Sequence, residues 1–243
     1  MLRAVVCAIA FLVSGTASAT PPNVILTAEF TEPTRRYDHG VLGDDVEWGA
    51  MHVTFDACAG CEHKTILQRT IRLPETRVFE DLKPRIIHDE FGLTALMVVE
   101  SDIYLGARLS IYTESGLYHA TPFIGQSHRW LAPVGSTDLD GDGIPEIAYV
   151  EKPHLSKELK IWKFEETGLS FVTSLRGLTN HRIGEDFISG GIRDCGSGPE
   201  IITADANWRW VMATRLRAGK LEARRLIPFK GKSSFQDVLA CRA

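Results

Sequence analysis

The segment best suited to chemistry is an acidic loop, Asp138-Leu139-Asp140-Gly141-Asp142-Gly143-Ile144-Pro145-Glu146. Its carboxylates stand at alternate positions, so a tight turn would bring them around one hard cation. Glycine adopts the backbone conformations that such a turn needs. Calcium takes roughly 6–8 oxygen ligands from carboxylates, carbonyls and water, whereas magnesium requires a tighter octahedron and usually keeps several waters. The loop therefore predicts a calcium site.

The expected ligands are carboxylate oxygens and one backbone carbonyl. They come from Asp138, Asp140, Asp142, Ile144 (through its carbonyl) and Glu146. The first half of the loop matches an EF-hand, but an EF-hand has Glu at its twelfth position, where this chain has Tyr149. The flanking segments also look like strands rather than helices. We therefore expect a calcium loop between strands.

Short runs of β-branched and aromatic residues, separated by Gly, Asp, Asn and Pro, dominate the chain, and helical periodicity is nearly absent. Many such runs at close spacing predict an all-β sandwich, barrel or propeller. The eight clearest runs are Met51–Phe55, Thr65–Leu73, Leu96–Val99, Arg108–Tyr112, Ile147–Val150, Leu159–Phe164, Ile201–Ala204 and Trp210–Leu216.

Four segments of the chain resemble one another. They are Pro33–Met51, Lys83–Val99, Ser127–Val150 and Asn180–Ala204. Near its start each has an arginine followed by a large apolar residue: Arg36-Tyr37, Arg85-Ile86, Arg129-Trp130 and Arg182-Ile183. A loop then leads into a strand that begins near Glu47, Ala95, Glu146 or Glu200. Charged, Gly-containing segments follow, and they indicate hairpins at Thr113–Leu117, Glu165–Leu169 and Arg217–Leu221.

A repeat of roughly 50 residues with about four strands is typical of a propeller blade. We therefore predict a small β-propeller of about four degenerate blades, occupying residues 20–243 as one domain. Asn23–Phe30 is expected to add a closing strand beside the last blade. A duplicated β-sandwich is the alternative architecture, and a half-propeller completed by dimerisation is a further one.

The carboxylate at the ninth position of the acidic loop resembles the calcium loop of FG-GAP/VCBS repeats, as found in integrin-type propellers. The apolar strand Ile147-Ala148-Tyr149-Val150 that follows fits the same pattern. The resemblance implies a propeller in which calcium staples the turn between adjacent strands of a blade. The other three repeats depart from the loop pattern, so a single calcium ion is expected.

The N-terminus predicts export. Arg3, the apolar run Ala4–Val13 and the small residues up to Ala19 form a signal peptide over residues 1–19. We therefore expect a periplasmic or secreted protein. The apolar run is too short to span a membrane, and no later segment is apolar enough. The net charge of −4 gives no electrostatic basis for binding nucleic acid.

Cys7 lies in the predicted signal peptide, and export makes the other four cysteines candidates for disulfides. Cys195 and Cys241 would close a long loop, and Cys58 and Cys61 would close a turn, although three connectivities are open from the sequence. Cys58-Ala59-Gly60-Cys61-Glu62 has Glu62 where covalent haem attachment needs His. A disulfide-closed hairpin tip is therefore the favoured interpretation of that segment.

Two further groups of residues bear on function. Tyr37-Asp38-His39-Gly40 offers an Asp–His pair for acid–base chemistry, but no partnered nucleophile is visible, so a hydrogen-bonded turn is favoured and no catalytic residue is assigned. Trp208-Arg209-Trp210 suits either packing, which is favoured, or a platform for a protein or carbohydrate ligand. The leading hypothesis is a calcium-stapled binding or scaffold module with an unknown protein or carbohydrate ligand. The alternative is an exported hydrolase that uses carboxylates.

Overall fold

A computed structural model describes residues 23–89 and 91–242 of the chain, so the predicted signal peptide lies outside the described residues. Strands dominate, and the described part contains the single helix α1 (Lys232–Leu239). This part of the chain has no helix with the length and apolar character needed to cross a bilayer. The all-β prediction is confirmed.

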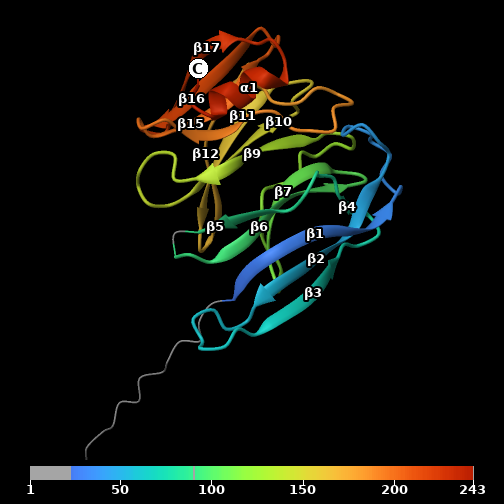
Figure 1. Ribbon diagram of the computed structural model, residues 1–243. Coiled ribbons are helices and arrows are strands. Elements are labelled where there is room, and N and C mark those ends of the chain that lie inside the picture. Colours follow the sequence, from blue (N-terminus) through green and yellow to red (C-terminus); the bar gives the residue numbers. More distant parts are fainter. Residues whose placement is uncertain (1–22, 90, 243) are drawn as a thin grey trace, which may run out of the picture.

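The strands form four successive units, which are stacked in sequence order from the blue end to the red end of the molecule (Figure 1). The first unit contains β1 (Val24–Thr34), β2 (Glu47–Asp56) and β3 (Ile66–Arg72). The second contains β5 (Arg85–His88), β6 (Thr94–Asp102), β7 (Gly106–Thr113) and β8 (Gly116–Ala120). The third contains β9 (Leu131–Thr137), β10 (Glu146–Glu151), β11 (Glu158–Glu165) and β12 (Gly168–Arg176). The fourth contains β14 (Gly191–Asp194), β15 (Pro199–Asp205), β16 (Trp210–Arg217) and β17 (Lys220–Pro228).

Each of the last three units is an antiparallel meander in which consecutive strands pair. Two short strands supplement them. β4 (Arg77–Phe79) pairs with both β2 and β6, and β13 (Leu178–Thr179) pairs with β15. Because β4 bridges them, the first two units share one hydrogen-bonded sheet, while the third and fourth have sheets of their own.

Seven of the eight predicted runs lie within strands of the structure, and the eighth, Thr65–Leu73, exceeds β3 by one residue at each end. The three predicted hairpins join β7 to β8, β11 to β12 and β16 to β17. The expectation for the first strand was wrong. β1 pairs along its length with β2, from Val24 opposite Asp56 to Thr34 opposite Glu47, and not beside the last unit. β2, the next strand in the sequence, offers β1 an antiparallel partner along its whole length, so β1 belongs to the first unit.

The central strands bury both faces, because each unit is covered by its neighbours. In β6, Met97 and Val99 pack toward the third unit, whereas Leu96 and Val98 join the core of the first. β10 repeats this alternation, and its residues divide between the core shared with the second unit and the core shared with the fourth. Successive side chains of a strand point to opposite faces, so a continuous apolar run is what a doubly covered strand requires.

Residues 35–46, between β1 and β2, leave the first unit and reach the third and fourth. The hydroxyl of Tyr37 accepts a hydrogen bond from the backbone N–H of His128 at 2.8 Å. The carbonyl of Val41 accepts one from the N–H of Gly184 at 3.3 Å. We call residues 35–46 the strap. It joins the first unit to the last without a strand pairing between them.

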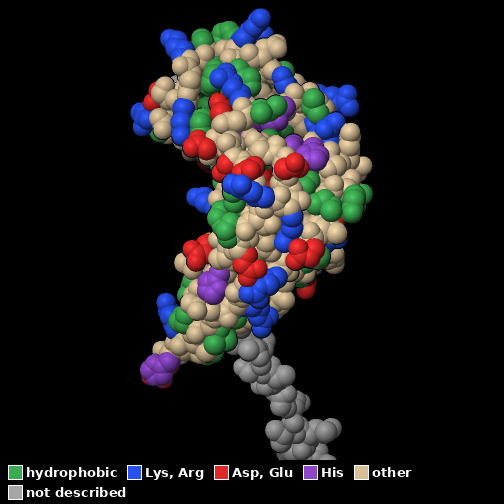
Figure 2. Space-filling model, turned by 90° about the vertical axis from the view of Figure 1, so that its right-hand side faces the viewer, with side chains coloured by type: hydrophobic (Ala, Val, Ile, Leu, Met, Phe, Trp, Pro, Cys, Tyr) green, Lys and Arg blue, Asp and Glu red, His purple; other side chains and the backbone are tan. Residues whose placement is uncertain are grey.

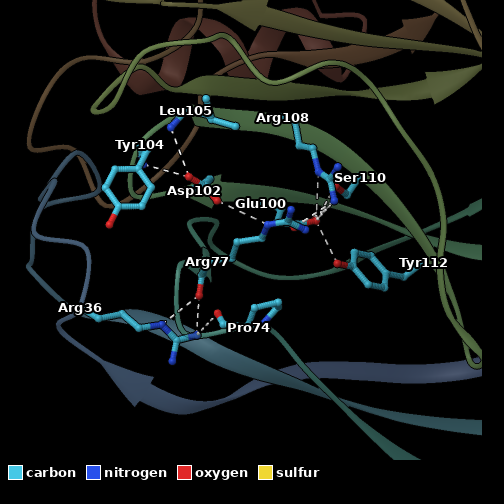
Figure 3. A network of polar contacts seen from close by, with 10 residues as sticks. All are labelled: Arg36, Pro74, Arg77, Glu100, Asp102, Tyr104, Leu105, Arg108, Ser110 and Tyr112. Atoms are coloured by element: carbon cyan, nitrogen blue, oxygen red, sulfur yellow. Dashed lines mark hydrogen bonds and ion pairs between the residues drawn. The ribbon is translucent and has the colours of Figure 1, made fainter.

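The strap is anchored at its start by Arg36 (Figure 3). The guanidinium of Arg36 donates hydrogen bonds to the carbonyls of Arg77 and Pro74. The side chain of Arg77 in turn contacts Glu100, with 3.1 Å between Nη1 and Oε1, and so ties the anchor to the middle of β6. A buried ionic network thus fixes the point from which the strap departs.

Both predicted disulfides form. Cys58–Cys61 closes the tip of the β2–β3 hairpin, and Cys195–Cys241 holds the chain after α1 against the β14–β15 turn. Phe235 and Val238 of α1 are buried against the fourth unit. Trp208 precedes β16 and packs against Phe229 and Phe235, in agreement with the favoured packing role of that segment.

Candidate metal site

The acidic loop connects β9 to β10 at one end of the third unit. Leu139 is buried in the core shared with the fourth unit and holds the loop to the sheet. The N–H groups of Gly141 and Gly143 donate to the two carboxylate oxygens of Asp138, at 2.7 and 2.9 Å. Both glycines have φ near +90°, a conformation that disfavours other residues. The local sequence therefore sets the turn.

Three of the predicted ligands come together. Asp138, Asp140 and Glu146 each offer a carboxylate oxygen, and these oxygens lie within 4.8 Å of one another. Calcium–oxygen distances are about 2.3–2.6 Å, so two ligands of one ion are separated by at most about 5 Å. The three oxygens have the spacing that a shared calcium ion requires.

The other two predicted ligands are placed differently. The carboxylate of Asp142 accepts a hydrogen bond from the N–H of Ile144 at 2.9 Å and is ion-paired with Lys163, the cross-strand partner of Glu146 on β11. Asp142 therefore lies outside the group of three. Its role as a ligand, and that of the Ile144 carbonyl, remain predictions.

Glu146 is the buried member of the site. Its Oε2 accepts a hydrogen bond from the N–H of Leu139 at 2.7 Å, while its buried Oε1 has no hydrogen-bond partner among the described residues. The Lys163 ammonium lies 3.5 Å from Oε1. Burial raises the pKa of Glu146 to about 7; the Leu139 N–H opposes this rise, and the charge of Asp140 adds to it. A cation beside Oε1 would satisfy this carboxylate.

The equivalent strands of the first and fourth units also have a buried glutamate at their first or second residue. In the fourth unit, Glu200 contacts the guanidinium groups of Arg193, Arg215 and Arg224 at 2.8–2.9 Å. Burial alone would raise the pKa of Glu200, but its hydrogen bonds to Arg224 and Arg193 hold that pKa below its usual value. Fixed cations thus neutralise this carboxylate. The side chain of Asp194, which aligns with Asp140, accepts hydrogen bonds from backbone N–H groups of its own turn.

In the first unit, no arginine or lysine of the described residues pairs with Glu47. Burial, together with the nearby carboxyls of Glu80, Asp44 and Asp81, raises the pKa of Glu47 to about 9. Glu47 therefore carries a proton at neutral pH. The glutamate at the start of the second strand is thus neutralised by a proton in one unit and by arginines in another, and the third unit has an acidic loop in the corresponding place.

Because Glu47 is protonated in the folded protein, we expect the free energy of unfolding to depend on pH. Its folded pKa lies above the unfolded value of about 4.3, so the unfolded chain loses this proton first as pH rises. Stability is therefore lost between about pH 5 and pH 9, at up to about 1.4 kcal/mol per pH unit. Glu47→Gln should remove this part of the loss and unfold at higher urea than the unaltered protein at pH 8, but not at pH 5. Glu75→Gln, at an exposed side chain, is the control. Parallel pH profiles for Glu47→Gln and the unaltered protein would contradict this account.

Sequence reasoning missed a second site, a histidine-lined pocket. The strap residue His39 was paired in sequence with Asp38, but its Nδ1 lies 2.5 Å from Oε1 of the buried Glu80, while Asp38 lies near His128 instead. The available signal was the arginine–apolar pair near the start of each of the four similar segments, because Arg129 and Trp130 line this pocket together with Ile183.

No protein-family model, curated protein or solved structure matches the chain. Its function is therefore argued from the geometry of its sites.

Proposed function

We propose that the chain is an exported calcium-binding repeat protein of the FG-GAP/VCBS type, in which calcium staples the β9–β10 turn of a binding or scaffold module. The observation that carries the proposal is Glu146: a buried carboxylate whose Oε1 lacks a hydrogen bond, and which groups with the carboxylates of Asp138 and Asp140. Burying a carboxylate is costly unless a proton, a cation or a hydrogen bond compensates it.

Lys163 does not replace the cation in this proposal. Its ammonium contacts Asp142 and stands 3.5 Å from Glu146, on the side away from the hydrogen-bonded Oε2. Three carboxylates within 4.8 Å of one another concentrate more negative charge than one ammonium offsets. Lysine has a flexible stem and a strongly hydrated head, so it can withdraw to solvent when a divalent ion binds.

The strand order supports the propeller-type architecture. Three antiparallel four-stranded meanders follow one another, and the second and third units bury both faces against their neighbours, as propeller blades do. The strap then connects the first unit to the fourth. A protein or carbohydrate ligand would bind the loops that gather around the strap, because loops on one face are where repeat proteins often bind.

The two disulfides support the proposed export, since disulfides persist in oxidising compartments. The periplasm or the extracellular medium is the proposed location. Both bonds lie at turns or chain ends that contribute little core of their own, where a covalent link adds the most order.

The experiment is a thermal melt with and without calcium. A ligand at 100 times its Kd stabilises the folded state by about 2.7 kcal/mol, which is about 5–11 °C in Tm for a domain of this size. Asp140→Asn should lose most of that shift. The matched control is Asp194→Asn, because Asp194 occupies the equivalent position in a turn without the acidic group. No calcium shift in the unaltered protein, or an equal shift in Asp140→Asn, would overturn the proposal.

A further inference from the structure

A pocket of about 280 Å³ lies where the strap meets the third and fourth units. Its lining comes from segments far apart in the sequence, and its polar or aromatic members are His39, His128, Arg129, Trp130, Lys152 and His154. Histidine side chains lie beside Lys and Arg in the upper part of the face shown in Figure 2. The pocket shares no lining residue with the acidic loop.

Every titratable side chain that lines this pocket is a base, although the protein as a whole carries a net charge of −4. Arg129 donates one hydrogen bond from Nη1 to the carbonyl of His128 at 3.0 Å and makes no ion pair with any described residue. Lys152 is held only loosely, with 3.4 Å between its Nζ and Oε1 of Glu151. Arg129 and Lys152 therefore line the cavity as two cations, and most of their N–H donors have no carboxylate partner among the described residues.

His39 is oriented by a fully buried carboxylate. Oε1 of Glu80 lies 2.5 Å from Nδ1 of His39, and the hydroxyl of Ser101 donates to the other oxygen. The Nδ1 edge of the ring therefore faces the core, and Nε2 is the nitrogen on the cavity side. A hydrogen bond between Nε2 of His39 and an anion in the cavity would complete the polar contacts of this ring.

His154, unlike the cationic side chains of the pocket, offers a hydrogen-bond acceptor. The carbonyl of Glu185 is only an acceptor, so Nε2 of His181, 2.9 Å away, carries the proton. Nδ1 of His181 then accepts from Nε2 of His154 at 2.9 Å, which leaves Nδ1 of His154 with a lone pair. Burial, with a smaller contribution from His181, lowers the pKa of His154 to about 4, so His154 is neutral at pH 7. The pocket thus contains one fixed acceptor among its donors.

The pocket is also held in shape by its supports. The ring of Tyr37 stacks on that of His128, with 5.0 Å between centroids, and the indole N–H of Trp130 donates to the carbonyl of Glu80 at 2.9 Å. The N–H of Lys152 donates to the carbonyl of Trp130. Leu155 and Ile183 add an exposed apolar margin. A small cavity with a few fixed polar groups and an apolar margin is typical of a small-molecule site.

We propose that this pocket binds a small organic anion that carries hydroxyl groups beside its carboxylate or phosphate, such as a sugar acid or a sugar phosphate. Arg129, Lys152 and His39 bind the charge, and Nδ1 of His154 accepts a hydrogen bond from a hydroxyl. Binding is independent of the calcium site, because no residue is shared.

The test is isothermal titration in calcium-containing buffer with four probes. Glucuronate and glucose 6-phosphate carry both features, glucose lacks the charge, and cyclohexanecarboxylate lacks the hydroxyls. At least one of the two anionic sugars should bind with a Kd in the millimolar range or below. Glucose and cyclohexanecarboxylate should each bind at least tenfold more weakly. The anion that binds identifies carboxylate or phosphate as the preferred group.

The variant for this test is Arg129→Gln/Lys152→Gln, which should weaken binding of that anion at least tenfold. The control, Lys64→Gln/Lys220→Gln, removes two exposed cations outside the pocket and should bind as the unaltered protein does. Thermal melts establish that both variants are folded. No saturable binding of either anionic sugar would overturn the proposal. Equal binding of glucose or of cyclohexanecarboxylate, or equal weakening by both variants, would do the same. None of these outcomes bears on the calcium-dependent melt.

Discussion

Glu100→Gln should lower the free energy of unfolding by about 3–5 kcal/mol, the usual cost of breaking a buried ion pair by removing one partner. The carboxylate is fully buried in β6. It accepts hydrogen bonds from Arg108, Ser110 and Tyr112 at 2.8–3.0 Å and pairs with Arg77 at 3.1 Å (Figure 3). Glutamine keeps the shape but leaves Arg108 without a buried counter-charge and Arg77 with Asp102 alone, at 3.5 Å. The amide NH₂ of glutamine would also face the donors of these guanidinium groups.

Urea unfolding at pH 7 measures this loss. The control is Glu32→Gln, because Glu32 pairs with Arg72 at 2.7 Å while both side chains are exposed. An exposed pair contributes about 1 kcal/mol or less. If the two variants lose the same free energy, the network of Glu100 does not stabilise the junction of the first two units, and the anchor of the strap must be sought elsewhere.

Removal of the Cys195–Cys241 disulfide by a double serine substitution should cost about 4 kcal/mol, because the bond closes a loop with a sequence separation of 46 residues. The loss of stability should be greatest at α1, whose Phe235 and Val238 pack against the strands of the fourth unit. Amide exchange of α1 should therefore accelerate more than that of β10.

The matched control is the double serine variant of Cys58 and Cys61, which are three residues apart. So short a loop restricts the unfolded chain less, and its removal should cost about 2 kcal/mol. Chemical denaturation of both variants gives the comparison. If both variants lost the same free energy of unfolding, or if only the variant of Cys58 and Cys61 lost any, the role assigned to the Cys195–Cys241 bond would be contradicted.

The strands were predictable because local sequence determines them. β6 and β10 are apolar on both faces, and turns such as Arg217–Leu221 have the glycine that a hairpin needs, so both could be recognised without knowledge of neighbouring units. β1 was misplaced because the sequence of an amphipathic strand does not specify its partner. The helix α1 was missed because its few apolar residues, such as Phe235, are spread over only two turns.

The two sites differ in the same way. The acidic loop lies within nine consecutive residues, so the grouping of Asp138, Asp140 and Glu146 could be predicted from spacing alone. The ion pair of Asp142 with Lys163 could not, because it depends on a neighbouring strand. The histidine pocket is assembled from separate segments. Glu80, which orients His39, lies 41 residues away in sequence and has no local pattern that distinguishes it from a surface carboxylate.

The strap also means that the four units are not held together by contacts between neighbours alone. In an array with nearest-neighbour contacts only, stability is approximately a sum of the terms for each unit and each interface. Here Val41, which precedes the second strand of the first unit, is hydrogen-bonded to Gly184 at the entry to the fourth. Insertion or removal of an internal unit would separate these residues and divide the walls of the pocket. The strap therefore sets the distance that the intervening units must span, so a change in loop length should be tolerated better than a change in the number of units.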